Sequence, residues 1–484
     1  MPSSLLRLTR RARRLGEPDS PVPVFWLAVA GMLAAQLHRT IHDVDLFWQL
    51  KLGELTLDRG LPRTEPFLAG RDGEPLAVVA WLGQAAFAAA RRAGGWDGLR
   101  LFDAAVWLAG FAAVGWSLAR RGANQWAVAL GVWVGWFAAV PFASIRPQSF
   151  AVCCFGLLVV LARSGLSPRA KVGLGAALLV LWQNLHPSAA VGAAYLAAAA
   201  AGEWGRFFLA GGRRPDAARV LLVPIAAAAT FATPAGADIH RISAENLDRC
   251  VWDQLLITEW LPIWECFPEV GRGYATPMLL ATAVLVAARG RRARAEDLVP
   301  LAALTAMTLL TFRFVLFWGV AIIPVWAECL APAGGPAPAP PRGRRLRRAV
   351  AAAGFALALV PLAVWPRNFA AYYPLAGAEA LRAAGVRGTV YCSYLWGGIV
   401  TDFGYPDWRP THDGRYYLFS REELARHFAA GRGEVPVDEL DREFRPAAFF
   451  LHPGRDDELA LRLRGDPRWR EVYSDPNCFV FVRR

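Results

Sequence analysis

Charge is scarce in this chain, and lysine is almost absent. Charged residues make up 19% of the 484 positions, against about 25% in soluble domains, and Lys51 and Lys171 are the only lysines. In place of charge, the chain has long blocks of Ala, Leu, Val, Phe and Trp. Because about 20 apolar residues span a bilayer core, these blocks argue against a soluble protein and predict an α-helical polytopic membrane protein.

The sequence also lacks several signatures of metal proteins and hydrolases. Its seven cysteines show no metal-ligand spacing, and neither a phosphate-cradling glycine loop nor a Ser–His–Asp arrangement is evident. A disulfide between Cys250 and Cys266 stays open as an alternative if their loop faces an oxidising compartment. Cysteine usage therefore says little about function.

Eleven apolar blocks succeed one another and predict about eleven transmembrane helices. The formal net charge of +13 comes almost entirely from Arg, clustered in short loops between the blocks. Such placement is typical of topology signals rather than of a nucleic-acid surface. The blocks lie near residues 22–37, 99–119, 126–143, 150–162, 172–185, 189–209, 220–233, 275–288, 298–311, 314–330 and 350–365.

The positive-inside rule orients these blocks. With a cytoplasmic N-terminus and one crossing per block, every second loop is Arg-rich and the loops on the other side are nearly bare of cations. This pattern holds only if residues 78–90, which are Ala-rich, form a helix in the interface and do not cross. We therefore expect a multi-pass protein of a bacterial inner membrane.

The predicted organisation has three parts. Residues 1–21 form a basic cytoplasmic N-terminus, and residues 22–366 form the transmembrane domain with a first outer loop at 40–97. After Pro366 the composition becomes that of a soluble domain, and strand-like and helix-like segments alternate. Residues 367–484 are therefore expected to form a small extracytoplasmic α/β domain.

In this topology the distinctive polar residues fall on the outer side. Charges near a membrane are costly and persist mainly when they are paired or functional. Two guanidinium groups are suited to a phosphate group, and Trp side chains to a sugar or a lipid groove. The candidates outside the first loop are Arg146, Asn184, His186, Glu259, Trp260 and Arg313. The alternative is that these charges pair with one another and the aromatics only anchor the helices.

Asp43 and Asp45 open the first outer loop, shortly before Trp48. In an extended segment the two carboxylates share a face, where they repel unless a cation lies between them. A carboxylate here could act as a general base. We therefore favour a functional pair over an accidental one.

The stretch "HDVDLFWQLKLGELTLDRGLPRTEPF" resembles the opening signature of a group of bacterial multi-spanning proteins in the GT-C glycosyltransferase superfamily. These include RgtA/B/C/D-like and dolichyl-phosphate-mannose mannosyltransferase-like proteins. The later motifs "RPQ", "QNLHPS", "ITEWLP" and "FRFVLFWGVAIIPVWA" agree in order. The chain departs from the usual pattern at Gln49, where His is frequent, and at Glu65, where Asp is usual.

The resemblance implies transfer of a sugar from a polyprenyl-phosphate carrier, usually with inversion. It maps Asp43 and Asp45 onto the acidic motif of the family. One of them would act as base toward the acceptor hydroxyl, or both would bind a divalent metal such as Mg²⁺ or Mn²⁺. The expected partners are the bilayer, a polyprenyl-phosphate sugar and a glycan, lipid or protein acceptor, with no nucleic acid.

Two other functions stay open from the sequence. One is a non-catalytic glycan- or lipid-binding membrane protein, and the other is a transporter of lipid-linked glycans, which would need polar residues near mid-membrane in several spans. In the tail, Asp413 and Arg415 follow a probable strand, where α/β sites often form. They would either bind acceptor or form a structural contact.

Overall fold

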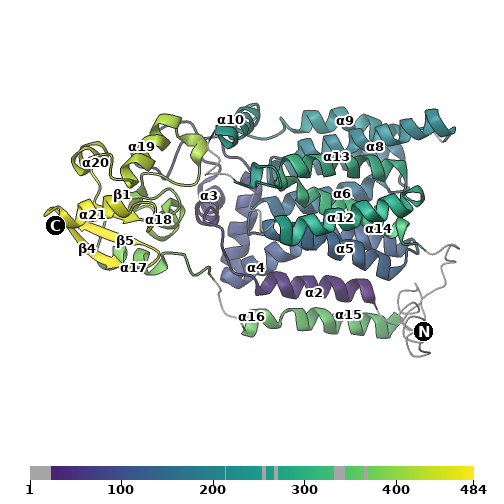
Figure 1. Ribbon diagram of the computed structural model, residues 1–484, viewed down its shortest axis with the longest axis horizontal. Coiled ribbons are helices and arrows are strands. Elements are labelled where there is room, and N and C mark those ends of the chain that lie inside the picture. Colours follow the sequence, from purple (N-terminus) through teal and green to yellow (C-terminus); the bar gives the residue numbers. More distant parts are fainter. Residues whose placement is uncertain (1–22, 213, 253–257, 266–270, 332–343, 365–368) are drawn as a thin grey trace. The chain divides into compact units, whose positions relative to one another are not determined.

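The computed structural model describes residues 23–484 except 213, 253–257, 266–270, 332–343 and 365–368 (Figure 1). The basic N-terminus at 1–21 and Cys266, and hence the Cys250–Cys266 pairing, lie outside the described residues. The chain forms two compact units. The first contains the residues up to Arg39, Trp96–Ile239 and Asn246–Pro366; the second contains Thr40–Gly95, His240–Glu245 and Arg367–Arg484.

The first unit is built of helices, and each of the predicted apolar blocks contains one. Several run alongside one another in Figure 1, where α15 lies beside α2 and α13 beside α14. The helices are α2 (Val24–His38), the second part of α4 (Trp81–Arg120), α5 (Gln125–Ala139), α6 (Gln148–Ala162), α7 (Pro168–Leu185), α8 (Ala189–Ala210), α9 (Ala217–Ala229), α12 (Thr276–Arg289), α13 (Ala295–Leu310), α14 (Val315–Cys329), α15 (Arg344–Ala358) and α16 (Val360–Val364). Helix α10 (Asp238–Trp252) has residues in both units.

Four helical segments are long and apolar enough to cross a bilayer, judged by length and composition. They are Trp81–Arg120, Gln125–Phe142, Phe312–Cys329 and Arg345–Val364, while α2, α6 and α9 are apolar but shorter. A membrane protein is therefore supported. The count of eleven crossings stays a prediction.

Close packing of small residues holds the helices of the first unit together. Helices α5 and α14 meet at Gly135 and Gly319, where a Cβ atom added to Gly135 would lie 1.8 Å from the carbonyl oxygen of Gly319. Small residues at such crossings let two backbones approach closely. Membrane helices gain van der Waals contact in this way, because the hydrophobic effect does not favour their association inside a bilayer.

The Arg-rich loops of the first unit are joined by contacts at helix ends. Arg163, which follows α6, pairs with Asp297 at the start of α13 and, at 2.8 Å, with Glu328 at the end of α14. Arg121, which follows α4, donates to the carbonyl oxygen of Arg163 at 2.7 Å. These loops therefore share one end of the helical unit, as the predicted topology requires.

Helix α4 is interrupted at Gly94 and Gly95, whose backbone angles are not helical. Residues before the break belong to the second unit, and residues after it to the first. In the part before the break, Arg91 makes two hydrogen bonds, of 2.8 and 2.9 Å, to the carboxylate of Asp402 in the tail. This first part thus packs against the tail.

The second unit joins the first loop to an α/β tail. Its strands are β1 (Gly388–Cys392), β2 (Trp408–Pro410), β3 (Ala448–Leu451), β4 (Trp469–Ser474) and β5 (Phe479–Arg483), ordered β2-β1-β3-β5-β4. β1 runs parallel to β2 and β3, while β5 is antiparallel to β3 and β4. The helices are α3 (Leu46–Arg59), α17 (Leu375–Ala383), α18 (Gly397–Gly404), α19 (Arg421–Gly431), α20 (Val437–Phe444) and α21 (Asp457–Gly465).

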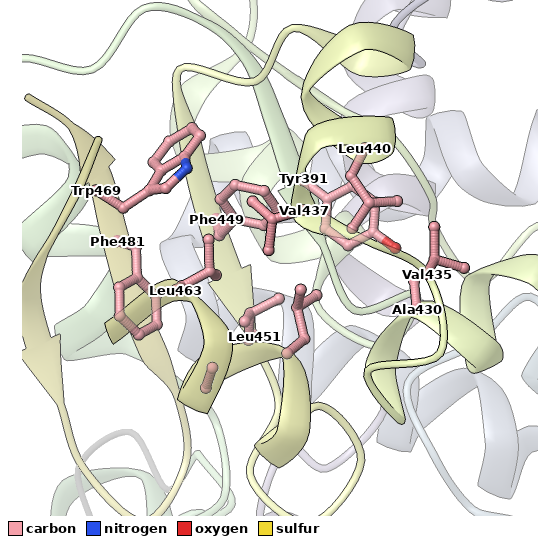
Figure 2. Close-up of a cluster of buried hydrophobic side chains, with 12 residues drawn as sticks. Tyr391, Ala430, Val435, Val437, Leu440, Phe449, Leu451, Leu463, Trp469 and Phe481 are labelled. Atoms are coloured by element: carbon pink, nitrogen blue, oxygen red, sulfur yellow. The ribbon is translucent and has the colours of Figure 1, made fainter. Parts of the chain in front are cut away.

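Alternating apolar residues build the core of the tail. Figure 2 shows Phe449 and Leu451 of β3 beside Phe481 of β5 and Leu463 of α21. Trp469 packs edge-on against Phe449 with ring centroids 4.7 Å apart. The sheet and these helices therefore share one continuous apolar core.

A buried ion cluster ties the first loop to the tail. Arg415 binds the carboxylate of Glu65 at 2.6 and 2.8 Å and that of Asp413 at 2.6 Å, and all three side chains are at most 1% exposed. Burial lowers the pKa of the guanidinium, but the charges of Asp413 and then Glu65 outweigh burial and raise that pKa above its usual value. Glu65 also accepts hydrogen bonds from the backbone N–H groups of Phe67 and Leu68, at 2.8 and 3.0 Å.

Replacing Arg415 with Met should destabilise the second unit by about 3–5 kcal/mol, because two carboxylates are left buried without their cation. The matched control is Arg409→Met. Arg409 also joins the tail to the first loop, through Asp72 at 2.7 Å and the carbonyl oxygen of Leu68 at 2.6 Å, but Asp72 is 73% exposed, so the loss should be only about 1–2 kcal/mol. Thermal unfolding and limited proteolysis of the purified chain measure the difference. Equal effects of the two substitutions would contradict the assigned role of the cluster.

Candidate functional site

The predicted site residues fall into two groups, one in each unit. Asp43, Asp45 and Trp48 lie in the second unit with Asp413 and Arg415. The other candidates lie in the first unit, and they are Arg146, Asn184, His186, Glu259, Trp260 and Arg313. Each group is described by itself.

Asp43 and Asp45 are held in place by local hydrogen bonds at the start of α3. The backbone N–H of Asp45 donates to Asp43 Oδ1 at 3.0 Å, and the indole N–H of Trp48 donates to Asp45 Oδ1 at 3.1 Å. Asp43 is buried, while Asp45 is half-buried. Each of the two acids therefore engages a different donor.

The tail approaches this acidic pair closely at Gly414. A Cβ atom added to Gly414 would lie 1.9 Å from Asp45 Oδ1, so the position accepts no side chain without a shift. Glycine at 414 thus lets the backbone of the tail lie directly against the Asp45 carboxylate. The acidic pair is bordered by protein on this side and supported by the ion cluster around Arg415.

The sequence predicts that Asp413 and Arg415 either bind acceptor or form a structural contact. Both are fully buried and bind each other and Glu65. The Arg415 guanidinium also lies 5.3 Å from the ring centroid of Phe67 and 5.7 Å from that of Trp48. This geometry favours the structural alternative.

In the first unit, two guanidinium groups converge on one carboxylate. Arg313 pairs with Glu259, and Arg146 Nη1 lies 3.7 Å from Glu259 Oε1. Arg313 also donates to Gln148 Oε1 at 3.3 Å and lies 5.4 Å from the ring centroid of Trp260. Arg146, Glu259 and Arg313 together carry one net positive charge, and their side chains are 16–22% exposed.

His186 belongs near these arginines, whereas Asn184 has a structural role. Burial and then the charges of Arg313 and Arg146 lower the pKa of His186 to about 3, so the ring is neutral at pH 7. Its Nδ1 lies 2.8 Å from the hydroxyl of Ser188. The Asn184 amide donates to the carbonyl oxygens of Val180 and Ala232, at 2.8 and 2.7 Å, and so joins α7 to the segment after α9.

Asp103 and Ser149 form a further polar pair in the first unit, which the sequence motifs did not indicate. Asp103, in an apolar block, is 6% exposed and accepts a hydrogen bond from the Ser149 hydroxyl at 2.6 Å. Ser149 adjoins Gln148, which contacts Arg313. An acid within a predicted membrane span is itself a signal of function, and it could have identified Asp103.

A divalent metal fits the acidic pair in donor chemistry. Among the residues that the structure describes, no group of three or more His, Cys, Asp or Glu side chains could hold a metal ion. Mg²⁺ however takes one or two carboxylates and completes its octahedron with water and substrate phosphate. Asp43 and Asp45 would supply those two carboxylates.

Comparison with known proteins identifies the fold. No protein-family model and no curated protein matches the chain. The archaeal oligosaccharyltransferase AglB from Archaeoglobus fulgidus, solved in complex with an inhibitory peptide and a dolichol-phosphate, aligns over 95% of this chain and 74% of its own, with a TM-score of 0.55 and 11% identity.

Two further solved structures agree. ArnT from Cupriavidus metallidurans in the apo state aligns over 95% of this chain and 97% of its own, with a TM-score of 0.50 and 14% identity. The mycobacterial arabinofuranosyltransferase AftD aligns over 94% of this chain and 41% of its own, with a TM-score of 0.50 and 15% identity. All three are GT-C glycosyltransferases. The chain therefore has a GT-C-like fold, as the sequence motifs predict.

Proposed function

We propose that the chain is a membrane glycosyltransferase that moves a sugar from a polyprenyl-phosphate donor to an acceptor of the cell envelope, at the outer face of the membrane. The observation that carries the proposal is the convergence of Arg146 and Arg313 on a single carboxylate, Glu259. Two partly exposed guanidinium groups that lie close together are suited to an anionic group such as a lipid phosphate. The GT-C-like fold supports the same reaction class.

The reaction assigns different steps to the two groups of residues. Asp43 or Asp45 accepts the proton of the acceptor hydroxyl, whose oxygen attacks the anomeric carbon of the donor sugar. The bond from that carbon to the phosphate oxygen breaks, and the polyprenyl-phosphate leaves with both bonding electrons. Arg146 and Arg313 stabilise the negative charge that develops on the phosphate. By the topology predicted from the sequence, both groups face the outer side.

The acidic pair offers a place for a divalent cation in the same scheme. The cation would be held by Asp43 and Asp45 and would supply positive charge to a bound phosphate group. Glu65, which replaces the usual Asp of the family motif, is not assigned a catalytic step because Arg415 and two backbone N–H groups occupy its oxygens.

Asp43→Asn and Asp45→Asn keep the shape of each side chain and remove the base. At least one of them should lower the transfer rate by about 100-fold or more, since general base catalysis contributes about 10²–10⁴-fold. Transfer of radiolabelled sugar from polyprenyl-phosphate donors in isolated membranes measures the rate. The control is Asp58→Asn, on the exposed end of α3, where the carboxylate pairs with Arg92 and is 53% exposed. Full activity of both test variants would refute the assigned roles.

Arg313→Gln removes one of the two phosphate-binding charges. It should raise the KM for the polyprenyl-phosphate donor at least about tenfold, the effect of losing about 1.4 kcal/mol of a charge-assisted hydrogen bond. Arg313→Lys should recover part of the loss because the charge remains but the planar fork does not. Arg241→Gln, at an exposed Arg241–Glu245 pair, is the control. An unchanged donor KM for Arg313→Gln would remove this arginine from the donor site.

A further inference from the structure

A polar cavity lies in the second unit, away from the buried ion cluster. Its volume is about 260 Å³, and it lies between β1, α19, α20 and the 69–74 segment of the first loop. Pockets for drug-sized ligands begin at roughly 300 Å³. This cavity therefore suits a single small polar molecule, of the size of one sugar ring.

Rings form part of the cavity wall. The His412 ring stacks on Phe419 with centroids 5.0 Å apart and planes 24° from parallel, and it lies 4.1 Å from the ring centroid of His427. The Arg71 guanidinium lies 4.7 Å from the ring centroid of Phe419. Tyr391 and Phe444 also line the cavity, so the wall combines rigid rings with a charged group.

Hydroxyl and imidazole groups are placed among these rings. The Tyr391 hydroxyl lies 3.3 Å from His427 Nδ1, and His412 Nδ1 lies 3.1 Å from the Thr411 hydroxyl. Thr389 also lines the cavity. Polar groups set among rings in a pocket wall are typical of a site that fixes the orientation of a small ligand.

Two guanidinium groups and three carboxylates line the cavity, and both guanidinium groups are paired. Arg71 pairs with Glu423 and, at 2.8 Å, with Glu74, while Arg426 lies 3.1 Å from Glu443. No surplus cation is therefore left for a phosphate or a carboxylate ligand. Paired guanidinium and carboxylate groups offer donors and acceptors side by side, which is what neighbouring sugar hydroxyls require.

The histidines add no positive charge at neutral pH. Burial and then Arg455 lower the pKa of His427 to about 4. Burial, followed by His427 and Arg71, lowers the pKa of His412 well below its usual value. The two imidazoles are thus uncharged hydrogen-bonding groups of the lining.

We propose that this cavity binds one neutral sugar residue of the glycan acceptor, between the His412 and Phe419 rings and the Arg426–Glu443 pair. The proposal deepens the proposed function and rests on it for the word acceptor. The sugar would contact Thr411 and His412, which line the cavity. Asp413 and Arg415, which follow them in the sequence, do not line it.

The test is sugar binding to the full chain in nanodiscs, measured by saturation-transfer NMR. The probes are the methyl glycosides of glucose, galactose, mannose, N-acetylglucosamine and arabinose, with inorganic phosphate as the anionic probe. At least one glycoside should bind, and phosphate should not compete with it. No binding by any of the five, or displacement of the bound glycoside by phosphate, overturns the proposal.

Two variants locate the binding. Ala69→Phe places a ring in the cavity from a half-buried lining position, and Arg426→Ala removes a rim group that is 44% exposed. Each should weaken glycoside binding at least tenfold. Arg432→Ala, at the exposed Arg432–Glu434 pair, is the matched control and should bind normally. Wild-type affinity in both test variants, with normal thermal unfolding, contradicts the site.

Glycoside binding and sugar transfer test the proposed sugar site and the proposed enzyme activity separately. The Asp45→Asn variant should bind the glycoside as the unmodified chain does, whatever its transfer rate, because Asp45 does not line the cavity. Glycoside binding without any transfer activity would keep the sugar site and reject the enzyme. Transfer activity without glycoside binding would keep the enzyme and reject the cavity as its acceptor site.

Discussion

The buried pairing of Arg415 with Glu65 and Asp413 is the interaction on which the rest of the second unit depends. Its three charges are removed from water, so the cluster is stable only while the first loop and the tail stay together. The same loop begins with Asp43 and Asp45, and Gly414 lies directly against Asp45. The cluster therefore helps to position the segment that carries the acidic pair.

The second unit is predicted to lie outside the bilayer, and a compact unit placed there must lie on one side of it. Residues Thr40–Gly95, His240–Glu245 and Arg367–Arg484 belong to one unit, so the number of crossings between each successive pair of these segments must be even. The predicted blocks number six between the first two segments and four between the last two. The interface placement of residues 78–90 satisfies the same condition, since Arg91 is bound to Asp402 of the tail. The division into units is thus compatible with the predicted topology, which stays a prediction.

Features set by neighbouring residues could be predicted from the sequence, whereas contacts between residues far apart in the chain could not. Apolar blocks located the helices, and the Ser420 cap with Glu423 marked the start of α19. Arg146, Arg313 and Glu259 were named as site candidates from position, and the structure brings them together. The attachment of the first loop to the tail was not predicted, because the partners Glu65 and Arg415 are 350 residues apart. Asp103 was hidden in a block that was counted as apolar, and the His412–His427 contact depends on a fold that no local pattern reveals.

The most direct test of the account is the side of the membrane on which the second unit lies. In a chain whose seven native cysteines are replaced by alanine, single cysteines at Asp58 and Glu434, which are 53% and 56% exposed, can be probed in intact cells with a membrane-impermeant maleimide. We predict that both are labelled without lysis, while a cysteine at Arg294, which is 52% exposed in an Arg-rich loop, is labelled only after lysis. Labelling of Asp58 and Glu434 positions on opposite sides, or of both only after lysis, would contradict the account.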